Sequence, residues 1–62
     1  MDLKERLENI AQYFDDRATM FQDKANQIPL SYSKELHNAN VNRANTARLA
    51  AVDIREAIQL LP

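Results

Sequence analysis

Apolar residues recur at steps of three and four over the first half of this chain. They are Leu3, Leu7, Ile10, Phe14, Ala18, Phe21, Ala25 and Ile28. At about 100° per residue, this spacing keeps the side chains in one stripe along a helix. Asp2, followed three residues later by Glu5, is typical of a helix start, because the Asp carboxylate accepts an amide of the first turn. The pattern predicts an amphipathic helix over residues 2–28.

The second half of the chain repeats this spacing with smaller side chains. Its stripe consists of Leu36, Asn40, Ala44, Ala47, Ala51, Ile54, Ile58 and Leu61. Between the two stripes, Pro29 disfavours helical backbone at the residue before it and lacks an amide proton. Either Ser31 or Ser33 can cap the helix that follows. We expect a turn over residues 29–32 and a second helix over residues 33–61.

The lengths of these elements indicate how they pack. Two long helices joined by about four residues lie antiparallel. Ala11, Ala18 and Ala25 lie seven residues apart, as do Ala44 and Ala51, so the two backbones can approach closely. The chain has no glycine, which the tight turns of most sheet folds require. The sequence predicts an all-α fold in which residues 1–62 form a single antiparallel two-helix hairpin.

Self-association is the expected source of additional stability. A chain of 62 residues buries little core, and it has no cysteine for disulfides or thiolate metal sites. Apolar residues outside the main stripes are candidates for an interface with a second copy or a partner: Tyr13, Met20, Val41, Leu49, Val52 and Leu60. The simplest assembly is a homodimer in which two hairpins form an antiparallel four-helix bundle. The alternatives are a higher oligomer and a monomer that folds on a larger protein.

One polar residue, Asn40, interrupts the apolar stripe of the second helix. Arg43 lies at the edge of that stripe, and the hairpin register places Arg17 opposite. We expect these three side chains to form a buried polar layer, because a polar side chain within a helical seam can fix register and oligomeric state. The candidates for an ion pair with Arg43 are Asp15, Asp16 and Asp23.

The segment around this position is rich in asparagine. Asn38, Asn42, Asn45 and Arg48 could contact phosphates and base edges, and asparagine is a poor choice for a helix interior unless it has another role. However, the formal net charge of the chain is −1, and no aromatic residue interleaves with these four. A nucleic-acid-binding face is therefore an alternative to protein binding, and the less favoured one.

The sequence carries no arrangement typical of catalysis or of a metal site. His37 is the single histidine and lacks a second ligand at helical spacing. Asp15 and Asp16 are adjacent, so their side chains point about 100° apart and do not act as a pair. Helix capping explains Ser31 and Ser33, which have no nearby base. We expect neither enzyme activity nor a cofactor.

The hydropathy pattern also bears on location. No stretch approaches the roughly 18 apolar residues of a membrane span, and the N-terminus lacks the form of a secretory signal. We expect a cytoplasmic protein without membrane contact. The hypothesis that follows is a small regulatory or protein–protein interaction module that self-associates, of the kind that phages and mobile elements encode to modulate a larger protein. The alternatives are an RNA- or DNA-binding helical-bundle regulator and a purely structural assembly component.

Overall fold

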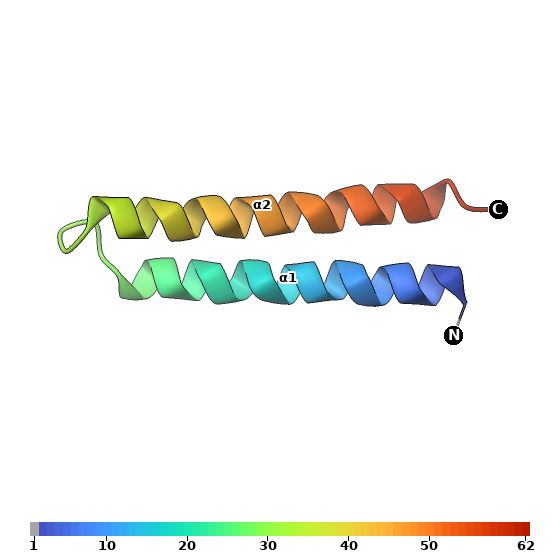
Figure 1. Ribbon diagram of the computed structural model, residues 1–62, viewed down its shortest axis with the longest axis horizontal. Helices are drawn as coiled ribbons and strands as arrows, with labels where there is room; N and C mark the ends of the chain where they lie inside the picture. The colour runs from blue at the N-terminus through green and yellow to red at the C-terminus, as the bar shows by residue number, and fades with distance from the viewer. Residues whose placement is uncertain (1) are drawn as a thin grey trace.

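Two helices run side by side along the whole length of the molecule (Figure 1). The computed structural model describes residues 2–62, with α1 at Leu3–Gln27 and α2 at Lys34–Gln59. The two ends of the chain lie at one end of the hairpin and the turn lies at the other (Figure 1). The described residues contain no strand. The prediction of an all-α, antiparallel two-helix hairpin is confirmed.

Both helices begin at the capping residues that the sequence indicates. The Glu5 amide donates to Asp2 Oδ1 at 2.8 Å, and the Leu36 amide donates to Ser33 Oγ at 3.2 Å. Each bond satisfies a first-turn amide that has no acceptor within its own helix. Of the two candidate serines, Ser33 is thus the cap, and the observed helices lie within the predicted ranges 2–28 and 33–61.

The turn is built around Pro29. Ile28 takes an extended conformation, and its amide still donates to the carbonyls of Lys24 and Ala25. The Pro29 carbonyl then accepts from the amide of Tyr32 at 2.9 Å and from that of Ser33 at 3.2 Å. No residue within 2–62 has a positive φ, so this turn needs no glycine.

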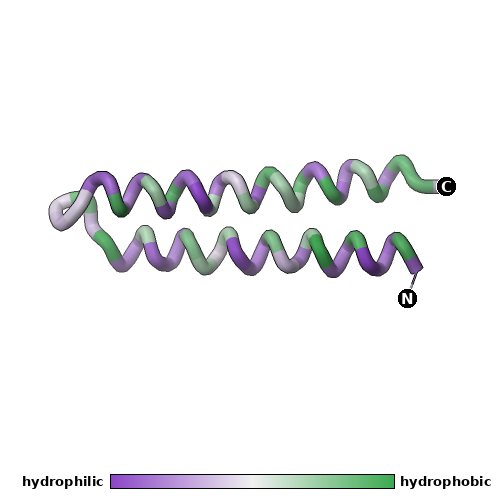
Figure 2. The backbone as a smooth tube through the Cα atoms, in the orientation of Figure 1, coloured by the Kyte–Doolittle hydropathy of each residue, from purple (hydrophilic) through white to green (hydrophobic). Residues whose placement is uncertain are grey.

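Alanine forms the centre of the seam between the helices. The buried residues are Ala11, Ala18 and Ala25 on α1, and Asn40, Ala44, Ala47, Ala51 and Ile58 on α2. Small side chains on both helices allow the backbones to approach closely. The hairpin is a single layer of two helices, with Cα extents of 49 × 18 × 10 Å. Figure 2 shows that hydrophobic residues nevertheless recur in successive turns of both helices.

The large apolar side chains flank this alanine seam. The expectation that Leu3, Ile10 and Leu36 point into the seam is wrong, because they are 59%, 45% and 51% exposed. Phe14 and Phe21 are half-buried. The physical reason is that the buried line follows the alanines, which places the larger members of each stripe on its edge. No large side chain within residues 2–62 is fully buried.

Candidate interaction site

Large apolar side chains gather on one broad side of the hairpin, which we call the apolar face. On α1 this face consists of Leu3, Ile10, Phe14 and Phe21, and on α2 of Leu36, Arg43, Ala50, Ile54 and Ala57. At 100° per residue each set falls within about 60° on its helix, beside the buried alanines. The two sets meet on the same side of the molecule, because Phe14 and Phe21 line one hollow together with Arg43 and Ala50.

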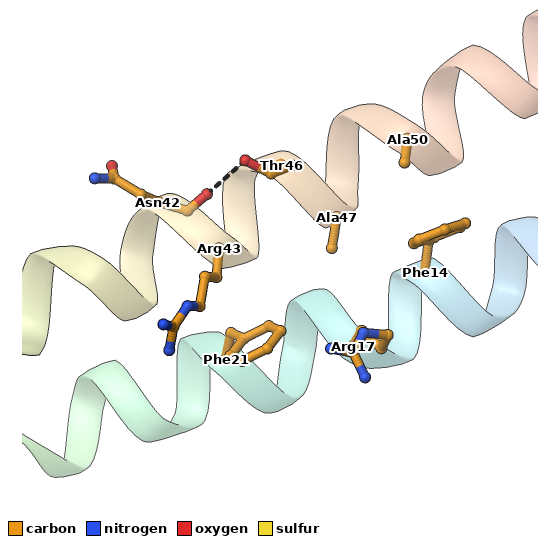
Figure 3. Close-up of a pocket in the computed structure, with 8 residues that line it drawn as sticks. All are labelled: Phe14, Arg17, Phe21, Asn42, Arg43, Thr46, Ala47 and Ala50. Atoms are coloured by element: carbon orange, nitrogen blue, oxygen red, sulfur yellow. Dashed lines mark hydrogen bonds between the residues drawn. The ribbon is translucent and has the colours of Figure 1, made fainter.

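This hollow lies at the middle of the apolar face and has a volume of about 430 Å³ (Figure 3). It is lined by Phe14, Arg17, Phe21, Asn42, Arg43, Thr46, Ala47 and Ala50. The two alanines leave space on α2 opposite the Phe14 ring on α1 (Figure 3). The Thr46 hydroxyl is not directed at a ligand, since it donates to the Asn42 carbonyl at 3.0 Å. The hollow is thus an aromatic and aliphatic depression with polar edges.

Three cations surround the ring of Phe21. The Arg17 guanidinium carbon lies 5.2 Å from the ring centroid, the Lys24 ammonium 5.7 Å and the Arg43 guanidinium carbon 5.9 Å. At these distances each cation is attracted to the π-electrons of the ring, by about 0.5–1 kcal/mol at an exposed site. Within residues 2–62 neither arginine makes an ion pair. The centre of the apolar face is therefore positively charged and has no carboxylate of its own.

Arg17 also extends the aromatic cluster along α1. Its guanidinium lies 5.6 Å from the centroid of the Tyr13 ring and donates to the Tyr13 hydroxyl at 3.4 Å. The rings of Tyr13 and Phe14 meet edge to face, with centroids 5.4 Å apart. These contacts hold Arg17 against α1, so its charge stays near the hollow.

The opposite broad side of the hairpin, which we call the ion-paired face, is closed by contacts within the chain. Arg55 Nη1 lies 2.7 Å from Asp15 Oδ2, and Arg55 Nε lies 3.8 Å from Glu8 Oε2. Glu8 and Asp15 are seven residues apart on α1, so one guanidinium from α2 reaches both. The sequence offered Asp15, Asp16 and Asp23 as candidates for an ion pair with Arg43. Within residues 2–62 Arg43 pairs with none of the three, because it lies on the apolar face.

His37 joins the two helices at the turn. Its Nδ1 lies 2.8 Å from the carbonyl oxygens of both Ala25 and Ile28. Both partners are acceptors, so Nδ1 carries the proton and donates. The ring thus gives the Ile28 carbonyl a donor and the Ala25 carbonyl a second one beside the Ile28 amide. His37 therefore has a structural role, because it links the start of α2 to the end of α1.

The residues proposed for a buried polar layer have different environments. Asn40 is 7% exposed, and its Nδ2 donates to the Leu36 carbonyl at 2.9 Å within α2. Arg17 is half-buried and Arg43 is exposed, and both lie beside the Phe21 ring at the edge of the seam. Only Asn40 therefore lies inside the seam. The arginines are excluded from it because the alanine-lined helices leave no room for a guanidinium.

The residues predicted as an association interface do not share one surface. Tyr13 and Met20 are exposed on the side of α1 away from α2, and Leu49 and Leu60 are exposed on the outer side of α2. Val52 is exposed and Val41 is half-buried, both toward the ion-paired face. The prediction that this set contacts a partner stays a prediction. The structure brings together instead the larger members of the two main stripes.

The asparagine-rich segment lies on the outer surface of α2. Asn38, Asn42, Asn45 and Arg48 are all exposed. Arg48 Nη1 donates to Asn45 Oδ1 at 3.0 Å, so part of this surface is paired with itself. The remaining amides face solvent.

Sequence reasoning missed the cation cluster around Phe21, although a signal for it was present. Arg17 and Lys24 precede and follow Phe21 by four and three residues, which places them on the same side of the helix. The contribution of Arg43 could not be found in this way, because it depends on the rotation of α2 about its own axis.

Comparison with known proteins gives no relative for this chain: no protein-family model, curated protein or solved structure matches it. In the described part of the chain, neither helix is apolar over a length that would cross a bilayer. The same residues contain no group of three His, Asp or Glu side chains arranged to hold a metal ion.

Proposed function

We propose that this chain is a small non-enzymatic interaction module that self-associates through its apolar face. The observation that carries the proposal is the position of the large apolar side chains. They lie together on one side of a layer whose Cα atoms extend only 10 Å in the thinnest direction. A single layer of two helices cannot cover such a face by itself, and burial of apolar area is the main force that drives association.

The size of the apolar face suits a second protein surface of similar dimensions. A second hairpin placed on the apolar face would give a four-helix bundle, in which the half-buried Phe14 and Phe21 become core residues. Two-fold dimers are the commonest closed assemblies of small proteins. The proposal keeps the cytoplasmic location expected from the sequence. It also keeps a larger protein as a further partner, which the outer surface of α2 with Leu49 and Leu60 could contact.

Measurement of mass in solution tests the proposal. Light scattering on a sizing column and sedimentation equilibrium should give twice the monomer mass of 7.1 kDa. Ile10→Asp places a charge on the apolar face and should yield monomers, because an unpaired charge in an apolar interface is strongly unfavourable. Leu49→Asp on the outer side of α2 is the matched control and should remain dimeric. A wild-type chain that is monomeric and fully helical at high concentration would contradict the proposal.

Nucleic-acid binding is the second candidate, favoured by the exposure of Asn38, Asn42, Asn45 and Arg48 on one outer surface. Titration with mixed RNA and DNA at low and high salt tests it, since phosphate contacts weaken as salt rises. If these residues bind nucleic acid, Arg48→Ala together with Asn45→Ala should abolish the signal without changing the mass of the protein. If no binding occurs at low salt, this surface is structural or contacts a protein.

A further inference from the structure

We infer that the apolar face is covered by a second copy of this chain that lies antiparallel to the first, with the two turns at opposite ends, and that Arg43 of each copy pairs with Asp53 of the other. This inference rests on the proposed self-association and specifies its geometry. It follows from the spacing of residues on the apolar face and from the position of the charges on it.

The apolar face is complementary to a second copy of itself that is rotated by 180° about an axis perpendicular to the helices. A two-fold axis across the middle of the hairpin, near Asp16 and Thr46, matches each helix with its own copy running in the opposite direction. The pairs on α1 are then Leu3 with Ile28, Ile10 with Phe21 and Phe14 with Arg17. The pairs on α2 are Leu36 with Ala57, Ile54 with Ala39 and Arg43 with Ala50.

These pairs satisfy the requirements of close packing. On α2 a large side chain faces an alanine in every pair, which allows the partner's helix to approach. On α1 the aromatic and aliphatic side chains face one another and would fill the hollow of about 430 Å³ between Phe14 and Ala50. Phe14 of one copy lies against Arg17 of the other, which repeats the cation–aromatic contact that Arg17 already makes with Phe21.

Charge disfavours the other two-fold arrangement, in which both turns lie at the same end. Arg17 and Arg43 approach the same Phe21 ring, so they lie at one level along the hairpin. A same-end dimer would put four guanidinium groups into a single layer, where the loss of water makes like-charge repulsion costly. In the opposite-end dimer the four groups lie at different levels, because the two Arg43 residues are staggered by seven residues, or roughly 10 Å, and the two Arg17 residues by three, or roughly 4.5 Å, at 1.5 Å per residue.

The opposite-end arrangement also supplies the carboxylate that the apolar face lacks. Asp53 is exposed and makes no ion pair within residues 2–62. It lies seven residues after Thr46, which lines the hollow, and seven before Leu60, which is on the outer side, so it stands at the border between the apolar face and the outer side of α2. Because Arg43 faces Ala50 of the second copy, Asp53 of that copy is about one helical turn away and within reach of the guanidinium.

Cysteine cross-linking tests the orientation directly, since the chain contains no cysteine. Thr46 lies beside the proposed axis, so Thr46→Cys should form a disulfide-linked dimer on mild oxidation in nearly all molecules. Leu49→Cys, on the outer side of α2, is the control and should stay reduced. If the wild type is a dimer by mass and Thr46→Cys does not cross-link, the orientation is wrong while the proposed function stands. A monomeric wild type would overturn both.

Exchange of the two charges tests the pairing. Arg43→Asp and Asp53→Arg should each raise the dissociation constant of the dimer about tenfold or more, and the double variant should return it to within about threefold of the wild type. Arg48→Asp changes the same charge on the outer surface and should leave the constant unchanged. A double variant no tighter than the weaker single variant would overturn the ion pair.

Discussion

The two broad sides of the hairpin differ in whether the chain completes its own contacts. On the ion-paired face, Arg55 reaches both Glu8 and Asp15, and His37 donates to two carbonyls at the end of α1. On the apolar face, Arg17 and Arg43 have only aromatic rings beside them, and large aliphatic side chains face solvent. The charged groups of the ion-paired face therefore have partners within the chain, whereas the arginines and large apolar side chains of the apolar face do not.

This difference shows that the amphipathic stripe of each helix serves two purposes. Its alanine members, together with Ile58, bring α1 and α2 together, and most of its larger members remain on one flank, where we propose that they serve association. A hairpin joined by Leu or Phe at the seam would bury these side chains between its own helices and leave no such flank. Four substitutions test this division between the two faces.

Phe14→Ala should have the largest effect, because Phe14 lies at the centre of the apolar face. We expect the free energy of unfolding to fall by about 3 kcal/mol or more, which would leave a domain of this size largely unfolded. Thermal melting followed by circular dichroism at several concentrations measures it. Leu49→Ala on the outer side of α2 should change stability by no more than about 0.5 kcal/mol. Equal effects of the two substitutions would remove the distinction between these surfaces.

Ala51→Leu tests the seam itself. Ala51 has no exposed surface, so the added isopropyl group of leucine should force the helices apart and lower stability by about 1–3 kcal/mol. Ala50→Leu adds the same atoms one residue earlier, where the side chain lines the hollow, and should be neutral for the hairpin. Urea denaturation of the two variants under one set of conditions gives the comparison. If Ala51→Leu is tolerated as well as Ala50→Leu, the helices are not held close by alanine.

His37→Ala tests the contact between the end of α1 and the start of α2. Loss of the donor removes the His37 bond from both carbonyls, of which Ala25 keeps the bond from the Ile28 amide, and we expect stability to fall by about 1 kcal/mol. His37→Asn keeps a donor on a shorter side chain and should recover part of the loss. Amide exchange read by NMR should show the greatest change around Ala25. An unchanged exchange rate there would mean that the His37 contact contributes nothing.

Arg55→Ala should have the smallest effect, because its ion pairs lie on a partly exposed surface. We expect a decrease of at most about 1 kcal/mol, which becomes smaller as the salt concentration rises. Glu8→Gln removes the longer of the two ion pairs alone and should change stability less still. Melting at two salt concentrations checks the result. A loss that does not depend on salt would point to packing of the Arg55 side chain in place of its charge.

The outline of the fold could be predicted from the sequence because few residues decide it. Pro29 ends α1, Asp2 and Ser33 cap the two helices, and the steps of three and four define their amphipathic sides. These are local effects, and each follows from the chemistry of the backbone within a few residues. The close approach of the alanines was also expected from their spacing.

The rotation of each helix about its axis could not be predicted in the same way. Ile10 and Ala11 are neighbours in sequence, yet Ile10 is 45% exposed and Ala11 is buried completely. A rotation of part of one turn exchanges these environments, and the apolar stripe is wide enough to allow it. The pairing of Asp15 with Arg55 depends on the same rotation. The sequence alone could therefore offer Arg43 as a candidate partner of Asp15.

The His37 contact implies an order in which the hairpin assembles. Its two acceptors lie nine and twelve residues back along the chain, so the contact closes a short loop with little loss of chain entropy. We therefore expect the turn end to form early and the helices to pack together from there toward the termini. Amide hydrogens near Ala25 and Ala44 should then exchange with deuterium more slowly than those near Ala11 and Ala51, which lie farther from the turn.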